Sequence, residues 1–92
     1  MSFEWDEEKR QSSLAKHGLD FADVVDFEMD TADHKPDLRK NYGETRFVST
    51  GYLHGRLCVL CWTLRTGRLR IISLRKANDR EQKIYQTRLA RP

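Results

Sequence analysis

Two tight turns in the second half of the chain constrain its fold more than any other feature. His54-Gly55 and Thr66-Gly67 separate segments rich in β-forming residues, so strands are expected over 46–53, 57–64 and 68–75. A connection of two residues leaves no room for a crossover, so strands joined in this way run antiparallel. The sequence therefore predicts a three-stranded antiparallel meander.

The turns also give an expected register for the meander. Counting outward from each turn produces three cross-strand rows: Phe47–Trp62–Ile71, Thr50–Val59–Leu74 and Arg46–Thr63–Arg70. Apolar residues then lie on both faces of the sheet. We expect the N-terminal helices to cover one face, and the last helix or a partner protein to cover part of the other. The row with two arginines is either a ligand-facing patch or an exposed margin of the sheet.

The N-terminal third carries the signals of a short strand followed by two helices. Residues 3–5 form the strand, and Asp6 is an N-cap for a helix that runs to about His17. Gly18 then supplies the left-handed residue that ends this helix. Asp20 caps a second, short helix, whose inward-facing residues are expected to be Phe21, Val24, Val25 and Phe27.

The remaining segments complete a single domain. The polar stretch 31–42 contains Pro36 and indicates a loop with at most one edge strand. Asn78 and Glu81 have the spacing of a capping box, so a final helix begins there. Its inward residues are expected to be Ile84, Tyr85 and Leu89. The order of elements predicts one α+β domain over residues 1–92.

Charge is distributed unevenly along the chain. Residues 1–45 carry 12 acidic and 6 basic side chains, whereas residues 46–92 carry 2 acidic and 11 basic ones. The modest net charge of +3 therefore hides a strongly basic half. Such asymmetry favours a polyanionic partner, with nucleic acid as the first candidate.

Several other classes of protein fit the sequence poorly. Cys58 and Cys61 lie three apart on an expected strand, where their side chains point to opposite faces, so neither a metal nor a redox site is expected. No apolar run is long enough to span a membrane. The acidic N-terminus lacks the features of a secretory signal, so we expect the protein to be cytoplasmic, with no cofactor.

Four strings, in order along the chain, carry a resemblance to a known family. They are FEWDEEK at 3–9, KHG at 16–18 with Phe21, GE-x-R at 43–46, and RIIS-x-RKA-x-x-x-E-x-x-x-Y at 70–85. With Gly51 between them, these strings resemble the BrnT toxins, small ribonucleases of bacterial type II toxin–antitoxin pairs. Two positions depart from the family pattern: Ser13 stands where Asn is usual, and Leu74 where Ala is usual.

The resemblance implies a RelE-like fold and cleavage of RNA without a metal. It also implies neutralisation by a BrnA-type antitoxin. Such antitoxins typically carry a DNA-binding domain, so promoter DNA would be bound only through the antitoxin. An apolar sheet face permits a homodimer or a 2:2 complex with the antitoxin.

Metal-free RNA cleavage uses the 2′-hydroxyl as the nucleophile on the adjacent phosphate. The reaction needs a base, an acid and cations around the developing charge. Arginine suits the last role because it stays charged and binds phosphate bidentately. We therefore expect Arg46 and Arg75 to act in catalysis, and Lys16, Arg70 and Lys76 to bind RNA phosphates.

Three further residues are candidates for proton transfer, and each has a structural alternative. His17 is a candidate acid or base, or its charge offsets the dipole at the helix C-terminus. Glu44 is either a base or the ion-pair partner of Arg46. Tyr85 either presents its hydroxyl as an acid or phosphate donor, or only packs its ring. A non-catalytic nucleic-acid-binding module and a protein-interaction subunit remain as alternative functions.

Overall fold

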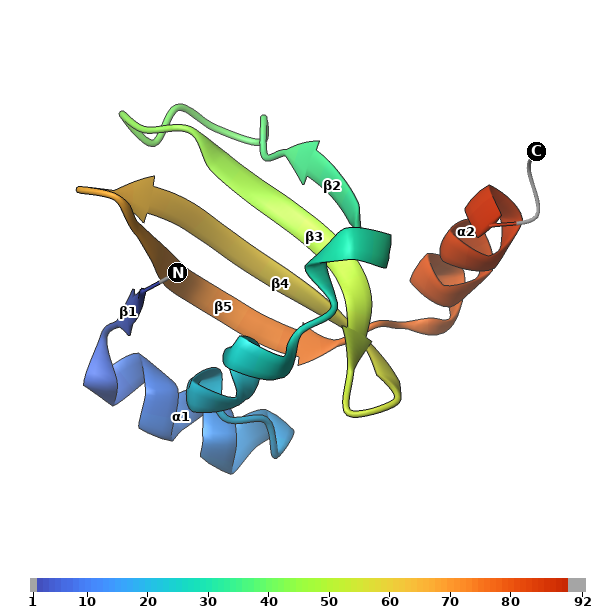
Figure 1. Ribbon diagram of the computed structural model, residues 1–92, viewed down its shortest axis with the longest axis horizontal. Helices are drawn as coiled ribbons and strands as arrows, with labels where there is room; N and C mark the ends of the chain where they lie inside the picture. The colour runs from blue at the N-terminus through green and yellow to red at the C-terminus, as the bar shows by residue number, and fades with distance from the viewer. Residues whose placement is uncertain (1, 90–92) are drawn as a thin grey trace.

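A five-stranded mixed sheet organises the chain, for which a computed structural model describes residues 2–89 (Figure 1). The strand order is β1-β5-β4-β3-β2, with β1 parallel to β5 and every other neighbouring pair antiparallel. The bounds are β1 Phe3–Trp5, β2 Asp33–Pro36, β3 Arg46–Leu53, β4 Arg56–Arg65 and β5 Arg68–Lys76. The predicted α+β class and the central meander are thus confirmed.

The helices begin and end where their capping residues stand. Helix α1 (Glu7–His17) has Asp6 as its N-cap, and the Asp6 carboxylate accepts hydrogen bonds from the backbone N–H groups of Glu8 and Lys9. It ends at Gly18, which has a left-handed φ of 70°. Helix α2 (Asp79–Leu89) follows the predicted capping box. Two short 3₁₀ helices, η1 (Phe21–Asp26) and η2 (Met29–Thr31), connect α1 to β2.

The two faces of the sheet are covered to different extents. α1, η1 and η2 lie on one face, here called the helix-covered face, whereas α2 stands apart beside the end of β5 (Figure 1). The helix-covered face holds the main core, which includes Phe21, Val24, Phe27, Leu53, Cys58, Leu60, Leu69, Ile71 and Leu74. The other face, here called the α2 face, holds a smaller cluster of Leu57, Val59, Ala77 and Tyr85.

Three of the residues predicted to face inward are not buried. Val25 is 66% exposed because η1 has three residues per turn, so only Phe21, Val24 and Phe27 recur on its inner side. Ile84 and Leu89 are also about half exposed, at 49% and 52%. Helix α2 touches only one end of the sheet and buries a single side chain, that of Tyr85.

A β-bulge in β5 changes the predicted register. The rows through Trp62 and Thr63 are as predicted, but Cys61 pairs with Ser73, which leaves Ile72 as an extra residue. Val59 consequently pairs with Arg75 and not with Leu74, so the predicted row Thr50–Val59–Leu74 is wrong at its last position. Without the bulge, Arg75 would lie opposite Cys58 on the helix-covered face. The bulge thus turns Leu74 into the core and Arg75 onto the α2 face.

Strand β2 is the edge strand that the polar stretch allowed, and a hydrogen-bond network fixes it to the sheet. The buried Ser49 hydroxyl accepts a bond of 2.8 Å from Trp62 Nε1 and contacts His34 Nδ1 on β2. His34 Nε2 lies 2.9 Å from the Met29 carbonyl. A carbonyl oxygen can only accept, so a proton on His34 Nε2 together with a bond donated by the Ser49 hydroxyl to Nδ1 satisfies every member of this network.

Gly51 lies where another segment approaches the sheet too closely for a side chain. A Cβ at this position would stand 2.8 Å from Ala32 Cβ and 3.0 Å from Phe27 Cζ. Gly51→Ala is therefore expected to destabilise the fold by about 1–3 kcal/mol through overpacking, measured by urea unfolding. The cost should shrink in an Ala32→Gly background, which removes the opposing atom. Equal costs in the two backgrounds would contradict the close approach.

Candidate active site

The Arg75 side chain is fixed by a carboxylate from the start of α2. Arg75 Nη1 and Nη2 donate to the two oxygens of Glu81 at 2.7 and 2.8 Å, and Nη1 also lies 3.3 Å from the Lys76 carbonyl. The hydrogen bonds with Glu81 raise the pKa of Arg75, and those from Arg75 lower the pKa of Glu81. Both groups are therefore ionised at neutral pH, and Arg75 has a structural partner that the sequence did not reveal.

A small hollow lies between α1 and the edge of β5 that β1 leaves uncovered. It has a volume of about 230 Å³, and we call it the edge hollow. Lys16 and His17 reach it from the end of α1, and Arg75 reaches it from β5. Ser13 anchors the helix here, since its hydroxyl donates to the Leu74 carbonyl at 3.3 Å. The other residues that line the edge hollow are Lys9, Ser12, Phe21, Ile72, Ser73 and Leu74.

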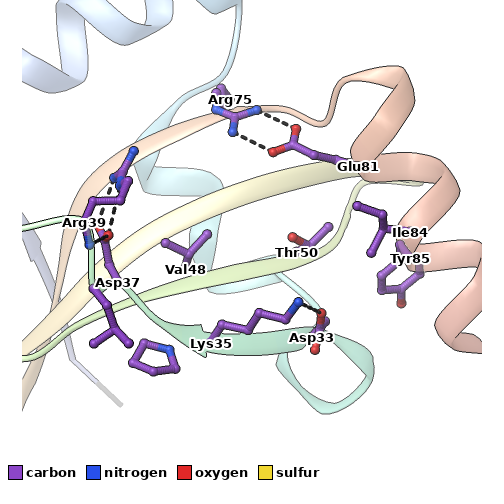
Figure 2. A pocket seen from close by; sticks show the side chains of 12 residues that line it. Asp33, Lys35, Asp37, Arg39, Val48, Thr50, Arg75, Glu81, Ile84 and Tyr85 are labelled. Atoms are coloured by element: carbon purple, nitrogen blue, oxygen red, sulfur yellow. Dashed lines mark hydrogen bonds and ion pairs between the residues drawn. The ribbon is translucent and has the colours of Figure 1, made fainter.

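A larger groove of about 560 Å³ runs over the α2 face, and we call it the α2 groove (Figure 2). Val48 and Thr50 form its floor, and Ile84 and Tyr85 form the wall on α2. The opposite wall comes from β2 and the loop that follows it, through Lys35, Pro36, Asp37, Leu38 and Arg39. Arg75 lines this groove as well as the edge hollow, so it stands where the two meet.

Sequence reasoning missed Lys35 and Arg39 as groove residues. Both lie in the acidic half of the chain, in the polar stretch 31–42, for which the sequence indicates a loop with at most one edge strand. Each has an acidic neighbour: Lys35 lies 3.7 Å from Asp33, and Arg39 lies 2.8 Å from Asp37. Hydrogen bonds from Arg39 hold the pKa of Asp37 well below its usual range. Carboxylates thus orient the Lys35 and Arg39 side chains in the groove. The local sequence does not predict that these two side chains line a groove.

The predicted row of Arg46, Thr63 and Arg70 forms at the other end of the sheet. Arg46 Nε lies 3.1 Å from Glu44, and Arg70 Nη1 lies 3.0 Å from Glu4 on β1. Glu44 also binds Arg65 at 3.1 Å, and hydrogen bonds from Arg65 and then Arg46 lower the pKa of Glu44. A carboxylate held in its charged form by two arginines is a weak proton acceptor, which favours the ion-pair role for Glu44.

Tyr85 and Lys76 lie apart from the edge hollow. The Tyr85 side chain is only 2% exposed, and its hydroxyl donates to the Thr31 carbonyl at 2.9 Å. Its ring packs edge-on against Tyr52, so the geometry favours packing over proton transfer. Lys76 is exposed and lines a different hollow beside α2, together with Arg56, Gln82 and Gln86.

The two cysteines lie on opposite faces of the sheet, as their spacing predicted. Cys58 belongs to the main core, whereas Cys61 pairs with Val48 and Ser73 on the α2 face. Burial raises the pKa of both thiols. Across residues 2–89, no three His, Cys, Asp or Glu side chains form a cluster suited to a metal ion. Within the same range, no helix is long and apolar enough to cross a membrane.

The edge hollow therefore combines three kinds of group. An imidazole can transfer a proton, a guanidinium can bind a phosphate through two N–H groups, and an ammonium adds positive charge. His17, Arg75 and Lys16 supply these groups from two elements that the Ser13 hydrogen bond holds together. This set is suited to acid–base chemistry on a phosphate ester.

Comparison with known protein families identifies a family model that covers most of the chain. A family model described as the ribonuclease toxin BrnT of type II toxin–antitoxin systems matches residues 5–81 of the 92. The matched range includes α1, the whole sheet except the first residues of β1, and the start of α2 up to Glu81. No curated protein matches the chain.

Proposed function

Because the chain belongs to the BrnT family of type II toxin–antitoxin ribonuclease toxins, we propose that it cleaves RNA without a metal, at the edge hollow. In the proposed reaction, the ribose 2′-hydroxyl attacks the adjacent phosphate, and the bond to the leaving 5′-oxygen breaks. One proton leaves the nucleophile and another is delivered to the leaving oxygen.

The convergence of Lys16, His17 and Arg75 on one hollow carries this proposal. His17 transfers a proton, as the base at the 2′-hydroxyl or as the acid at the leaving oxygen. Arg75 stabilises the charge that develops on the phosphate oxygens, and Lys16 adds a second cation. A site of this kind needs groups fixed in place beforehand, and the contacts of Arg75 with Glu81 meet that need.

The α2 groove and the row at the far end of the sheet provide a path for the flanking RNA. Lys35 and Arg39 line the groove beside Arg75, and Arg46 and Arg70 lie on the same face farther along. Lys76 extends the positive surface on the other side of α2. We assign these cations to phosphate binding. For Arg46 this replaces the catalytic role expected from the sequence, because Arg46 does not line the edge hollow.

The antitoxin partner follows from the family, and its identity and mode of binding are proposed here. We propose a BrnA-type antitoxin that covers the cationic face of the sheet, so that Arg46, Arg70 and Arg75 lie in the interface. Promoter DNA would then contact the antitoxin. The β1-α1-meander-α2 order also supports a RelE-like fold, and a bacterial toxin of this class would act in the cytoplasm.

The products of the reaction test the proposed chemistry. The purified chain is expected to cleave RNA in the presence of EDTA and to leave 2′,3′-cyclic phosphate and 5′-hydroxyl ends, because the 2′-oxygen is the nucleophile. Fully 2′-O-methylated RNA of the same sequence should resist cleavage. Products with 5′-phosphate ends would overturn the mechanism. RNA binding with a steep salt dependence but no cleavage would instead indicate a non-catalytic binding module.

A further inference from the structure

The Glu81 carboxylate connects the end of β5 to the residue that caps α2 and to α2 itself. Its oxygens accept two hydrogen bonds from Arg75, and Oε1 also accepts one of 2.9 Å from the backbone N–H of Asn78. The Glu81 N–H donates in return to Asn78 Oδ1 at 2.8 Å. The end of β5 and the first turn of α2 are thereby held as one unit. Glu81 belongs to the capping box, but capping alone does not require its second oxygen.

The contacts with Glu81 leave a defined part of Arg75 available. A guanidinium has five N–H groups. In Arg75 two of them point to Glu81 and one to the Lys76 carbonyl, so within residues 2–89 the Nε–H and one Nη2–H have no partner. These two N–H groups are parallel and form the side-on fork of the guanidinium, which matches two oxygens of a phosphate.

The exposure of Arg75 limits what the charge of this ion pair adds to stability. The Arg75 side chain is 43% exposed, and exposed ion pairs are worth little because solvent screens them. The capping function also does not need the charge, since glutamine serves at this position of a capping box. The charged pair instead fixes the orientation of Arg75. It holds the plane of the Arg75 guanidinium and, among the described residues, leaves the edge with the Nε–H and one Nη2–H free where the two hollows meet.

From this geometry we infer that Glu81 is a positioning residue for RNA cleavage, which holds the guanidinium of Arg75 so that its free fork meets the scissile phosphate. The inference rests on the proposed function and adds a residue to it. Glu81 does not touch the RNA; it acts through Arg75. Its removal should therefore lower kcat more than it raises KM, because the fork is most needed when charge develops on the phosphate.

Two matched variants test this role on the full chain with a fluorescently labelled RNA of mixed sequence. Glu81→Gln keeps an oxygen for the Asn78 N–H but presents an amide N–H₂ to Arg75, so the bidentate pair is lost. Asn78→Ala removes the side-chain cap and leaves the pair in place. We expect Glu81→Gln to lower kcat/KM about tenfold, and Asn78→Ala to lower the Tm but change kcat/KM by less than about twofold. In an Arg75→Ala background, Glu81→Gln should cause no further loss.

Each other outcome would overturn the inference. Unchanged or increased activity of Glu81→Gln would show that Glu81 is dispensable or that it masks Arg75. Equal losses in Glu81→Gln and Asn78→Ala would trace the effect to the stability of α2. A tenfold loss that persists in the Arg75→Ala background would mean that Glu81 acts independently. A folded wild-type chain without cleavage activity would overturn the proposed function as well. If the wild type is active, a negative result for the variants concerns only the role of Glu81.

Discussion

Replacing Arg75 with alanine is expected to lower kcat/KM for RNA cleavage by about 10²–10³-fold, the range found when one preorganised donor to a developing oxyanion is removed. The guanidinium lies at the meeting of the edge hollow and the α2 groove, and Glu81 fixes it there. Loss of this side chain removes both a positive charge and a bidentate donor. The fold should tolerate the change, since the Glu81 carboxylate keeps its bond to the Asn78 N–H.

Two comparisons make the Arg75→Ala result specific. Arg75→Lys keeps the charge but lacks the planar fork, so it should recover only part of the activity. Arg68→Ala removes an exposed arginine at the start of the same strand and should leave kcat/KM within about twofold of wild type. Initial rates on a labelled RNA, with the Tm of each protein, provide the measurement. Comparable losses in Arg68→Ala and Arg75→Ala would mean that general basicity, not this site, drives the reaction.

The elements of the fold were predictable because their signals are local. Two-residue turns fix the antiparallel order of neighbouring strands, and Asp6, Gly18 and the Asn78–Glu81 box mark the helix ends. The parallel pairing of β1 with β5 was not predictable in this way, because it joins residues more than sixty positions apart. The place of β2 at the other edge depends on similar long-range contacts, which bring Lys35 and Arg39 into the α2 groove.

The sequence predicts which residues are candidates for the site, but it does not predict where in the fold their side chains lie. The segment RIISLRK could pair with β4 in either of two registers. The bulge, in which Ile72 is the extra residue, decides which face of the sheet Arg75 occupies. The choice follows from burial: Leu74 must enter the core beneath α1 and η1, and Arg75 must not. Catalytic candidates on one strand can therefore be named from sequence, but the hollow they share depends on a one-residue shift that packing selects.

His17 is expected to be the second residue on which activity depends. His17→Gln should lower kcat/KM by about 10²–10⁴-fold, the usual contribution of a general acid or base. The imidazole stands beside Lys16 and opposite Arg75 in the edge hollow, within the helix end that Ser13 ties to β5. His54→Asn is the matched control, because His54 is an exposed turn residue with a left-handed φ of 50°, which asparagine tolerates. Activity of His17→Gln equal to that of the control would exclude proton transfer by His17.

The leaving group decides which proton His17 moves. In an RNA whose scissile 5′-oxygen is replaced by sulfur, the departing thiolate needs no proton, so a missing general acid costs little. If His17 is the acid, the defect of His17→Gln should largely disappear on this substrate. If His17 is the base, the defect should persist, because the 2′-hydroxyl must still lose its proton. In the second case the acid must come from another group near the hollow. Lys16, which lines the same hollow, would then be the first residue to replace.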